Sequence, residues 1–346
     1  MKNCYVSTFI SGLSEIVNNL IVKELLDVEI IQTFDGMIIY KTANHDKISK
    51  LKFVNNTFLL LGLKRNKVDK SFNDDMWELV QKLNLNFTII KNHIKSLKKR
   101  NFKILTVDKN QPVSINYKLI EKLEKTIENN LKVNLNKRNP DLEFTFLRRS
   151  EGIMLFMLKL TYNRMTEKQL QKGELRPELA YSLVSLANLN EDKIIMDPFC
   201  GHGSIPKQIV KNFKYNMCFA SDNDETMIQK LKNEYKKNTK KLFIKKRDAL
   251  HLDYFEDKFI DAIVTDPPWN IYESTNEQFD VFYKNMLEEF YRILKDNGTL
   301  IILMGNVNDF EIALDTLKKF KITKEYNILV NGKKANIYVL KKINRS

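Results

Sequence analysis

Residues 266–269 read Asp-Pro-Pro-Trp and follow the run Asp-Ala-Ile-Val-Thr, which has the composition of a buried strand. Proline has no N–H to donate to a sheet, so the pair must end that strand. The prolines also leave carbonyl groups without competing N–H donors, between the Asp266 carboxylate and the flat ring of Trp269. Such a set could accept hydrogen bonds from an amino group and stack against the ring that carries it. Taken alone, the same residues could equally form a rigid turn.

A second candidate element lies at 196–210, where an apolar strand runs into the sequence Asp-Pro-Phe-Cys-Gly-His-Gly-Ser. Gly201 and Gly203 fall in the turn that precedes a helix. Glycine allows positive φ and lets a ligand lie against the backbone, and the helix start offers free N–H groups. The turn lacks the dinucleotide fingerprint and the lysine of a phosphate-binding loop. Because Asp197 opens the turn, a ligand with positive charge, such as an amino acid attached to a sulfonium, fits best.

Two further acids follow the next expected strands, Asp222 at the end of 217–222 and Asp248 at the end of 241–248. A carboxylate in the first position could accept both hydroxyls of a ribose, and one in the second could meet an adenine edge. Ligands of open α/β sheets bind outside the carboxyl ends of the strands, so these acids should lie near the glycine turn and residues 266–269. Either acid could instead cap a helix.

The elements that must position these residues alternate along the C-terminal half. Short apolar runs alternate with amphipathic segments at 225–237 and 280–294, and this order is typical of a parallel sheet covered by helices. Near the end, two strand-like runs flank Asn331-Gly332, a strong hairpin signal. We therefore expect a mostly parallel sheet closed by an antiparallel hairpin. The expected parallel strands are 193–197, 217–222, 241–248, 261–266 and 299–305.

The N-terminal half shows strands and helices at shorter range, typical of small α+β domains. We expect a strand at 4–10, a helix at 12–26 and a strand at 36–42 in the first part. Further along, we expect a charged helix from 117 to 131. The expected strands of this second part are 101–107, 143–149 and 153–161, and the segment 161–176 is the expected connector to the C-terminal half.

The composition restricts the class of protein. The chain has 346 residues, a formal net charge of +14 and 43% hydrophobic residues. Lysine and arginine number 21 against 10 acids over 51–150, but 4 against 11 over 251–300, so the basic surface is expected in the N-terminal half. A polyanionic partner fits this distribution, although a solvated lysine-rich surface would look the same. Three dispersed cysteines and four histidines favour a reducing cytoplasm and give no zinc or disulfide pattern; no run is long enough to span a membrane.

The glycine turn, the acids at 222 and 248 and the Asp-Pro-Pro-Trp stretch together resemble S-adenosylmethionine-dependent methyltransferases that modify exocyclic amino groups. Their order along the chain is similar to that of the RNA guanine-N2 methyltransferases, as is the helix-like segment 173–187. The N-terminal half resembles the ferredoxin-like and THUMP module of these enzymes. The resemblance implies a ferredoxin-like domain at 1–70, a THUMP-like RNA-binding domain at 71–162 and a class I, Rossmann-like methyltransferase domain with a seven-stranded sheet at 163–346.

The resemblance also implies a role for individual residues. S-adenosylmethionine would be the cofactor, no metal would be required, and the target base would be held by the Asp-Pro-Pro-Trp stretch. The implied catalytic residues are Asp266, Pro267, Pro268 and Trp269. The implied cofactor-binding residues are Asp197, Pro198, Phe199, Gly201, Gly203, Asp222, Asp248 and Ala249.

RNA, in particular tRNA, is the expected partner, and the basic cluster of Lys95, Lys98, Lys99 and Arg100 beside the THUMP-like part is expected to contact its phosphates. The chain departs from the family at Trp269 and Asn270, where the guanine enzymes usually read Tyr-Gly, so the base is not fixed. Two alternatives stay open: a DNA methyltransferase acting on adenine N6 or cytosine N4, and a non-catalytic RNA-binding protein.

Overall fold

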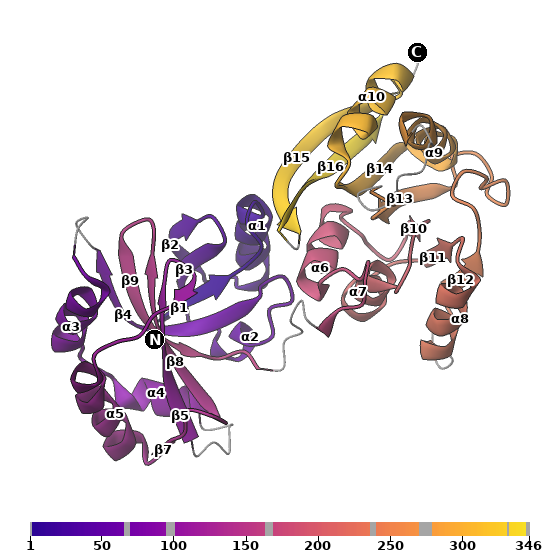
Figure 1. Cartoon of the computed structure of the whole chain (residues 1–346). Helices are drawn as coiled ribbons and strands as arrows, with labels where there is room; N and C mark the ends of the chain where they lie inside the picture. The colour runs from indigo at the N-terminus through magenta and orange to yellow at the C-terminus, as the bar shows by residue number, and fades with distance from the viewer. Residues whose placement is uncertain are drawn as a thin grey trace. The chain divides into compact units, whose positions relative to one another are not determined.

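The computed structural model describes residues 2–65, 70–94, 101–162, 169–235, 240–269, 279–330 and 332–343. The chain divides into two compact units. The first comprises Met1–Phe9 and Asn18–Arg164, and the second comprises Ile10–Val17 and Met165–Ser346. Each unit is built on its own β-sheet (Figure 1).

The sheet of the C-terminal unit contains seven strands among the described residues, in the order β12-β11-β10-β13-β14-β16-β15. All pairings from β12 to β14 are parallel, whereas β16 runs antiparallel to both β14 and β15. The predicted class I, Rossmann-like α/β fold is therefore confirmed. The strands are β10 (Ile194–Asp197), β11 (Met217–Asp222), β12 (Leu242–Lys246), β13 (Ile260–Thr265), β14 (Leu294–Met304), β15 (Phe320–Val330) and β16 (Lys333–Lys342).

Amphipathic helices connect these strands and bury one face each. In α9 the residues Tyr283, Met286, Leu287, Phe290 and Ile293 recur at helical spacing, and all five belong to the core. Helix α9 packs against α10, and α6 packs against α7. The helices are α6 (Pro177–Leu186), α7 (Ser204–Asn212), α8 (Glu225–Glu234), α9 (Phe279–Ile293) and α10 (Val307–Leu317).

The predicted hairpin closes one side of this sheet. Val330 at the end of β15 pairs with Lys333 at the start of β16, as the hairpin signal predicts. Gly332 has φ of +78°, a conformation that favours glycine and explains the sequence signal at this point.

The sheet of the N-terminal unit begins with a module of β-α-β-β-α-β order, which is the ferredoxin-like arrangement. Its four strands lie in the order β2-β3-β1-β4, and all three pairings are antiparallel. The elements are β1 (Asn3–Thr8), α1 (Ser14–Glu24), β2 (Glu29–Phe34), β3 (Met37–Thr42), α2 (His45–Ile48) and β4 (Asn56–Arg65).

The same sheet continues past β4 into the second part of the unit. Strand β4 pairs with β9, from Phe58 with Lys159 to Arg65 with Ile153, and β8, β5 and β6 follow in order. The domains predicted at 1–70 and 71–162 thus share one sheet, in which β4 has partners on both edges. The remaining elements are α3 (Phe72–Lys82), α4 (Phe87–Ile94), β5 (Asn101–Asp108), β6 (Gln111–Pro112), α5 (Tyr117–Leu131), β7 (Asn134–Leu135), β8 (Leu142–Arg149) and β9 (Ile153–Lys159).

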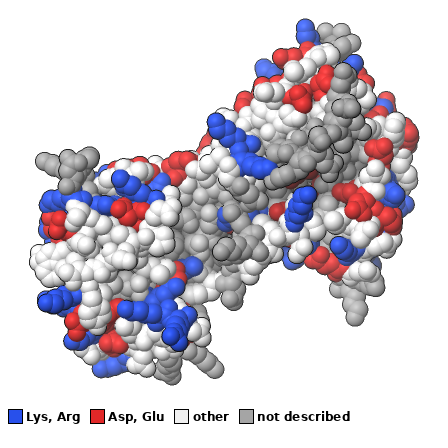
Figure 2. All heavy atoms as spheres, in the orientation of Figure 1, with Lys and Arg blue, Asp and Glu red and all other residues white. Residues whose placement is uncertain are grey.

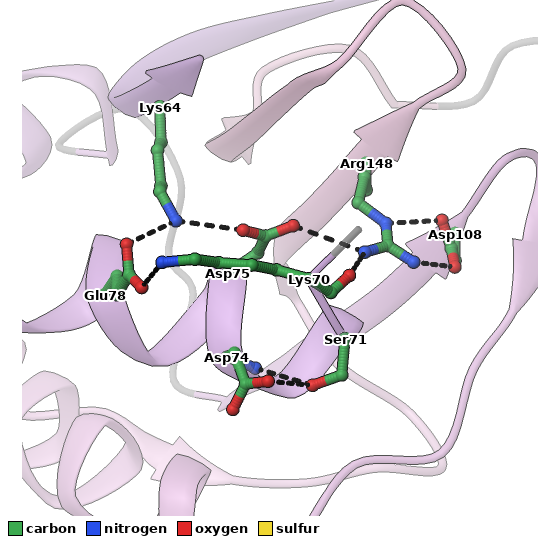
Figure 3. A network of polar contacts seen from close by, with 8 residues as sticks. All are labelled: Lys64, Lys70, Ser71, Asp74, Asp75, Glu78, Asp108 and Arg148. Atoms are coloured by element: carbon green, nitrogen blue, oxygen red, sulfur yellow. Dashed lines mark hydrogen bonds and ion pairs between the residues drawn. The ribbon is translucent and has the colours of Figure 1, made fainter. Parts of the chain in front are cut away.

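A buried ionic network ties α3 to three strands of this sheet (Figure 3). Asp75 is only 1% exposed and bonds to Lys64 at 2.9 Å and to Arg148 at 3.2 Å. Arg148 also donates from Nε and Nη2 to the two carboxylate oxygens of Asp108, which holds the pKa of that carboxyl below its usual range. Lys64 reaches Glu78 at 2.6 Å. Because each buried charge has at least one opposite partner, the network holds α3 on the sheet without leaving a bare ion.

Candidate functional site

The candidate residues converge where four parallel strands end. Strands β12, β11, β10 and β13 are neighbours in the sheet and point the same way, so their carboxyl ends share one edge. Asp197 is the last residue of β10, Asp222 is the last of β11, and Asp266 directly follows β13. The sequence placed these acids at one edge, and the sheet order brings them together there.

Asp197 is buried at this edge, with 1% of its surface exposed. Its Oδ1 accepts a 2.8 Å hydrogen bond from the Thr265 hydroxyl and a 3.3 Å bond from the Phe199 N–H. Burial raises the pKa of this carboxyl to about 8, against the effect of both hydrogen bonds, and the nearby Asp266 and Asp222 raise it further. Asp197 is therefore poised to become ionised when a cation arrives.

The glycine turn connects β10 to α7. Gly201 has φ of +45°, and a Cβ at this position would meet no atom within 4 Å, so open space lies in front of its backbone. Gly203 has φ of +77° and precedes α7; a Cβ there would lie 2.4 Å from Leu231 Cδ1. The first glycine thus keeps room for a ligand, whereas the second is required by packing and backbone conformation.

Asp222 fixes the position of this turn. Its Oδ2 accepts a 2.8 Å hydrogen bond from the Gly201 N–H, and its Oδ1 accepts a 2.9 Å bond from the Asp224 N–H. Each carboxylate oxygen can accept a further hydrogen bond, so Asp222 is held in one orientation and can still bind a ligand. This geometry is compatible with the predicted contact to two ribose hydroxyls.

Asp248 and Ala249 follow β12 and behave differently from each other. Asp248 is exposed and accepts a 2.9 Å bond from the Leu250 N–H, which stabilises its own turn. Ala249 is buried and belongs to the hydrophobic core of the unit. Its small side chain is thus explained by packing alone.

The Asp-Pro-Pro-Trp stretch is fixed by three contacts. The Trp269 indole N–H donates a 2.8 Å hydrogen bond to Asp266 Oδ1. The Tyr283 hydroxyl donates a 2.7 Å bond to the Pro268 carbonyl. The Trp269 ring lies against Gly305, where a Cβ would come within 2.1 Å of ring atom Cε3. Burial raises the pKa of Asp266 to about 7, although the indole bond lowers it.

Sequence reasoning missed Thr265, Tyr283 and Gly305. Thr265 was part of the strand, and the spacing of Tyr283 in α9 only indicated a core residue. Gly305 directly follows β14, and no local pattern links it to Trp269. The lone signal available was a glycine immediately after a buried strand, which often marks a close approach.

Cys200 and Phe199 lie in the turn between β10 and α7, whereas other predicted residues fall outside the described residues. Cys200 is buried, and burial raises its pKa, as expected for a packing thiol. Phe199 packs on Phe282 of α9 with ring centroids 6.2 Å apart. The RNA-binding prediction at Lys95, Lys98, Lys99 and Arg100, and the departure at Asn270, lie outside the residues that the structure describes.

A separate surface groove of about 640 Å³ lies elsewhere on the C-terminal unit. Its charged side chains are largely paired with one another: Arg292 bonds to Asp257 and Glu289, and Lys258 bonds to Asp296. None of the residues predicted for the site lines it. The groove therefore offers no competing arrangement for the same chemistry.

Comparison with known proteins decides between the classes that this geometry allows. Residues 164–336, half of the chain, match the family UPF0020, the RMKL-like methyltransferase domain. The chain belongs to this family. S-adenosylmethionine is accordingly the cofactor of the methyltransferase domain. Within the described residues, no lysine or arginine pairs with Asp197, Asp222 or Asp266, which fits a site for a cation such as the sulfonium.

Individual relatives and structures extend this result. A tRNA (guanine(10)-N2)-dimethyltransferase of Methanocaldococcus jannaschii is 30% identical over 235 residues, covering 63% of this chain and 62% of that enzyme. The type II methyltransferase M.HpaI of Haemophilus parainfluenzae is 40% identical over 62 residues, 16% of this chain and 20% of that protein. The chain thus spans less than two thirds of either relative. TrmN from Thermus thermophilus has the same fold, with a TM-score of 0.75 over 99% of this chain and 100% of that one, at 16% identity.

Two kinds of feature are absent from the described residues of the chain. None of the helices there is long and apolar enough to cross a membrane. No group of three or more His, Cys, Asp or Glu side chains there could hold a metal ion.

Proposed function

We propose that the protein transfers the methyl group of S-adenosylmethionine to the exocyclic N2 of guanine in RNA, and that its RNA is a tRNA. The observation that carries this proposal is Asp266, an acceptor with a pKa raised to about 7, beside the Gly201 turn in a methyltransferase domain. A relative that is 30% identical and named for guanine-N2 methylation of tRNA supports the choice of base and of RNA.

The proposed cofactor site is the edge formed by β10, β11 and β12. The open space at Gly201 would receive the methionine part, and Asp197 would face its positive charge. Asp222 would hold the ribose, and the turn after β12 would meet the adenine. The complete proposed set is Asp197, Pro198, Phe199, Gly201, Gly203, Asp222, Asp248 and Ala249.

The proposed catalytic step depends on the residues that hold the amine. The guanine amine is a weak nucleophile because its lone pair is delocalised into the ring. Acceptance of its two N–H groups by Asp266 and the Pro267 carbonyl would draw the nitrogen towards tetrahedral geometry and free the lone pair. The bound cofactor supplies an electrophilic methyl group, and holding the amine in line with it contributes through orientation. Asp266 then takes the proton that the methylated nitrogen releases.

The remaining residues of the stretch would keep this acceptor pair rigid. Tyr283 already binds the Pro268 carbonyl, so that carbonyl is committed to the fold. Pro267 has no described donor on its carbonyl, which is consistent with a role in binding the substrate amine. The exposed part of Trp269 would stack on the target base, which must leave its helix to reach Asp266.

The N-terminal unit is the proposed RNA-binding part, with residues 71–162 as its THUMP-like region. Helix α5 exposes Lys118, Lys122 and Lys125, and neighbouring Lys137 lies over the exposed ring of Tyr117 at 5.8 Å. Figure 2 shows groups of lysine and arginine side chains on this unit. Only Lys125 of the three helix lysines has an ion-pair partner among the described residues, Glu121 at 2.7 Å. Unpaired lysines on one helix can contact phosphates without reading sequence.

A comparison of nucleic acids tests the proposal. The purified protein and labelled cofactor are incubated in three separate reactions, one with unmodified tRNA, one with ribosomal RNA and one with duplex DNA. We expect label in tRNA, and we expect it to be lost when the methylated guanosine is replaced by inosine, which lacks only the N2 amine. Label that persists in the inosine transcript would exclude N2 as the acceptor.

A DNA amine is the second candidate substrate, because an Asp-Pro-Pro-Trp stretch could also hold adenine N6 or cytosine N4, and a segment of the chain matches the type II methyltransferase M.HpaI. That match spans 16% of this chain, far less than the tRNA-modifying relative. Methylation of duplex DNA without methylation of RNA would establish it. A cytoplasmic location is part of the proposal, and the three free cysteines Cys4, Cys200 and Cys218 agree with a reducing compartment.

A further inference from the structure

Trp269 forms a hydrogen bond with Asp266 in addition to offering a flat face for stacking. An indole can donate through its single N–H, and here that N–H points at Asp266 Oδ1 at 2.8 Å. The other carboxylate oxygen, Oδ2, has no donor among the described residues. One oxygen is thus held by the protein and the other is left to accept a bond from a substrate.

Two contacts fix the position of the Trp269 indole. Gly305, directly after β14, presents a bare backbone to the ring, and a Cβ there would lie 2.1 Å from Cε3 and 2.3 Å from Cδ2 of Trp269. Contacts below 3.0 Å cannot persist, so only glycine allows the ring to occupy this place. In addition, Tyr283 binds the Pro268 carbonyl immediately before the tryptophan and so fixes the backbone there. The ring is therefore placed by the fold before any base arrives.

The groups around Asp266 do not stabilise its ionised form, so the hydrogen bond from the indole matters more. The titratable groups that face it are Asp197 from β10 and Tyr283 from α9, and Asp309 of α10 lies near Tyr283. Each of these groups is neutral or negative, and burial disfavours the ionised form of Asp266. The indole N–H is the side-chain donor that opposes burial.

We propose that Trp269 is a positioning residue, which turns Asp266 and keeps it ionised so that Oδ2 can accept a bond from the target amine. Gly305 serves the same end by leaving room for the ring. This inference rests on the proposed methyl transfer for its consequence, although the hydrogen bond itself can be tested without any substrate. A phenylalanine would keep an aromatic face for the base but would lose the donor.

The first test observes the bond directly. The chain has two tryptophans, so protein labelled with ¹⁵N-tryptophan gives two indole N–H signals. We expect one signal, absent in Trp269→Phe, to shift with pH as Asp266 ionises, and we expect Asp266→Asn to abolish that shift. An indole signal of Trp269 that does not respond to pH between 5 and 9 would overturn the inference, whatever the substrate proves to be.

The second test separates positioning from stacking. We expect Trp269→Phe to move the acid limb of the kcat/KM profile upward by about one pH unit, since a donor to the carboxylate is lost. Gly305→Ala leaves the chemical identity of Asp266 and Trp269 unchanged but displaces the indole ring, so the same shift is expected. Trp77→Phe, which changes the other tryptophan in α3, is the control and should leave the profile unchanged.

The outcomes distinguish the inference from the proposed function. A loss of activity in Trp269→Phe that is equal at every pH would mean stacking alone and would contradict positioning. If the wild type methylates no guanosine, the proposed function fails, while the indole titration still decides the role of the bond. If the wild type is active and the indole titrates with Asp266, both stand.

Discussion

The Thr265 hydroxyl donates a 2.8 Å hydrogen bond to Asp197, which joins the carboxyl ends of the neighbouring strands β13 and β10. Thr265 directly precedes Asp266, so the proposed base-binding stretch and the proposed cofactor turn are connected through one side chain. Asp197 is buried, and its ionised form depends on the few donors that it has.

Removal of this hydroxyl should weaken cofactor binding. Thr265→Val keeps the shape of the side chain but leaves Asp197 with one fewer donor, so we expect about tenfold weaker binding of S-adenosylmethionine by calorimetry. Thr316→Val removes a hydroxyl that bonds to a helix carbonyl in α10 and serves as the control. Equal affinities of Thr265→Val and wild type would show that Asp197 does not act through this bond.

Removal of the Asp266 charge should stop transfer while sparing the cofactor site. We expect Asp266→Asn to lower kcat by at least about 100-fold, because an acceptor of the target amine becomes partly a donor. Cofactor affinity should change by no more than about threefold, since the proposed cofactor contacts lie on β10 to β12. Asp253→Asn, an exposed loop residue, is the control. A variant at 266 with full turnover would move the chemistry elsewhere.

Cofactor binding should strengthen as pH rises. The pKa values of Asp266 and Asp197 are raised to about 7 and about 8, and Asp197, which would face the cation, is protonated below its value and must lose that proton when the cofactor binds. We expect the affinity for S-adenosylmethionine to increase between pH 6 and pH 9 in calorimetric titrations, with proton release. The neutral-sulfur product should show a smaller dependence. An affinity that does not change over this range would contradict the proposal that Asp197 faces the charge of the cofactor.

The same groups make the unliganded protein less stable at high pH. A carboxyl whose pKa is raised on folding stabilises the fold fully below about 4 and loses this contribution as pH rises through its folded value. We therefore expect the melting temperature of the unliganded protein to fall from pH 6 to pH 9, and the cofactor to reverse the fall. Asp197→Asn should flatten the dependence, measured by thermal unfolding.

Much of the fold could be predicted because its signals are local. Gly332 has the positive φ that the hairpin signal predicts, and α5 has an apolar stripe between an Asn116 cap and its last buried residue, Leu131. The single sheet that runs through the whole N-terminal unit could not be predicted in the same way. It depends on the pairing of β4 with β9, a contact between distant segments that leaves no local pattern.

The candidate site shows the same limit. The acids and glycines could be predicted because each lies at the end of a strand or within a few residues after it, and the strand order then brings them together. Tyr283 and Gly305 could not, because a buried tyrosine in an amphipathic helix and a glycine after a strand have ordinary structural explanations. Their link to Trp269 and Pro268 exists only in three dimensions.

The buried network of Figure 3 should contribute to stability without contributing to chemistry. Asp75→Ala removes the carboxylate shared by Lys64 and Arg148, but each cation keeps a second partner, Glu78 or Asp108. We expect a loss of about 1–3 kcal/mol in the free energy of unfolding, measured with urea. The exposed neighbour Asp74 provides the control Asp74→Ala, for which a clearly smaller loss is expected. Equal losses would mean that the network adds little.

The lysines of α5 should contribute to RNA affinity. Reversal of two charges in Lys118→Glu with Lys122→Glu should weaken tRNA binding by at least about tenfold and reduce its salt dependence by about two phosphate contacts. The matched control reverses Lys214 and Lys241, which are exposed on the C-terminal unit. An identical effect of both pairs in filter binding would indicate net charge rather than a defined RNA-binding surface.

The central claim is that this chain methylates the N2 amine of guanine in tRNA. The most direct measurement is the identity of the labelled nucleoside after the pure protein has acted on unmodified tRNA with labelled S-adenosylmethionine, followed by complete digestion and mass spectrometry. The account predicts N2-methylguanosine or its dimethyl form, absent with Asp266→Asn. Label in another nucleoside, or no label from a protein that binds the cofactor, would contradict it.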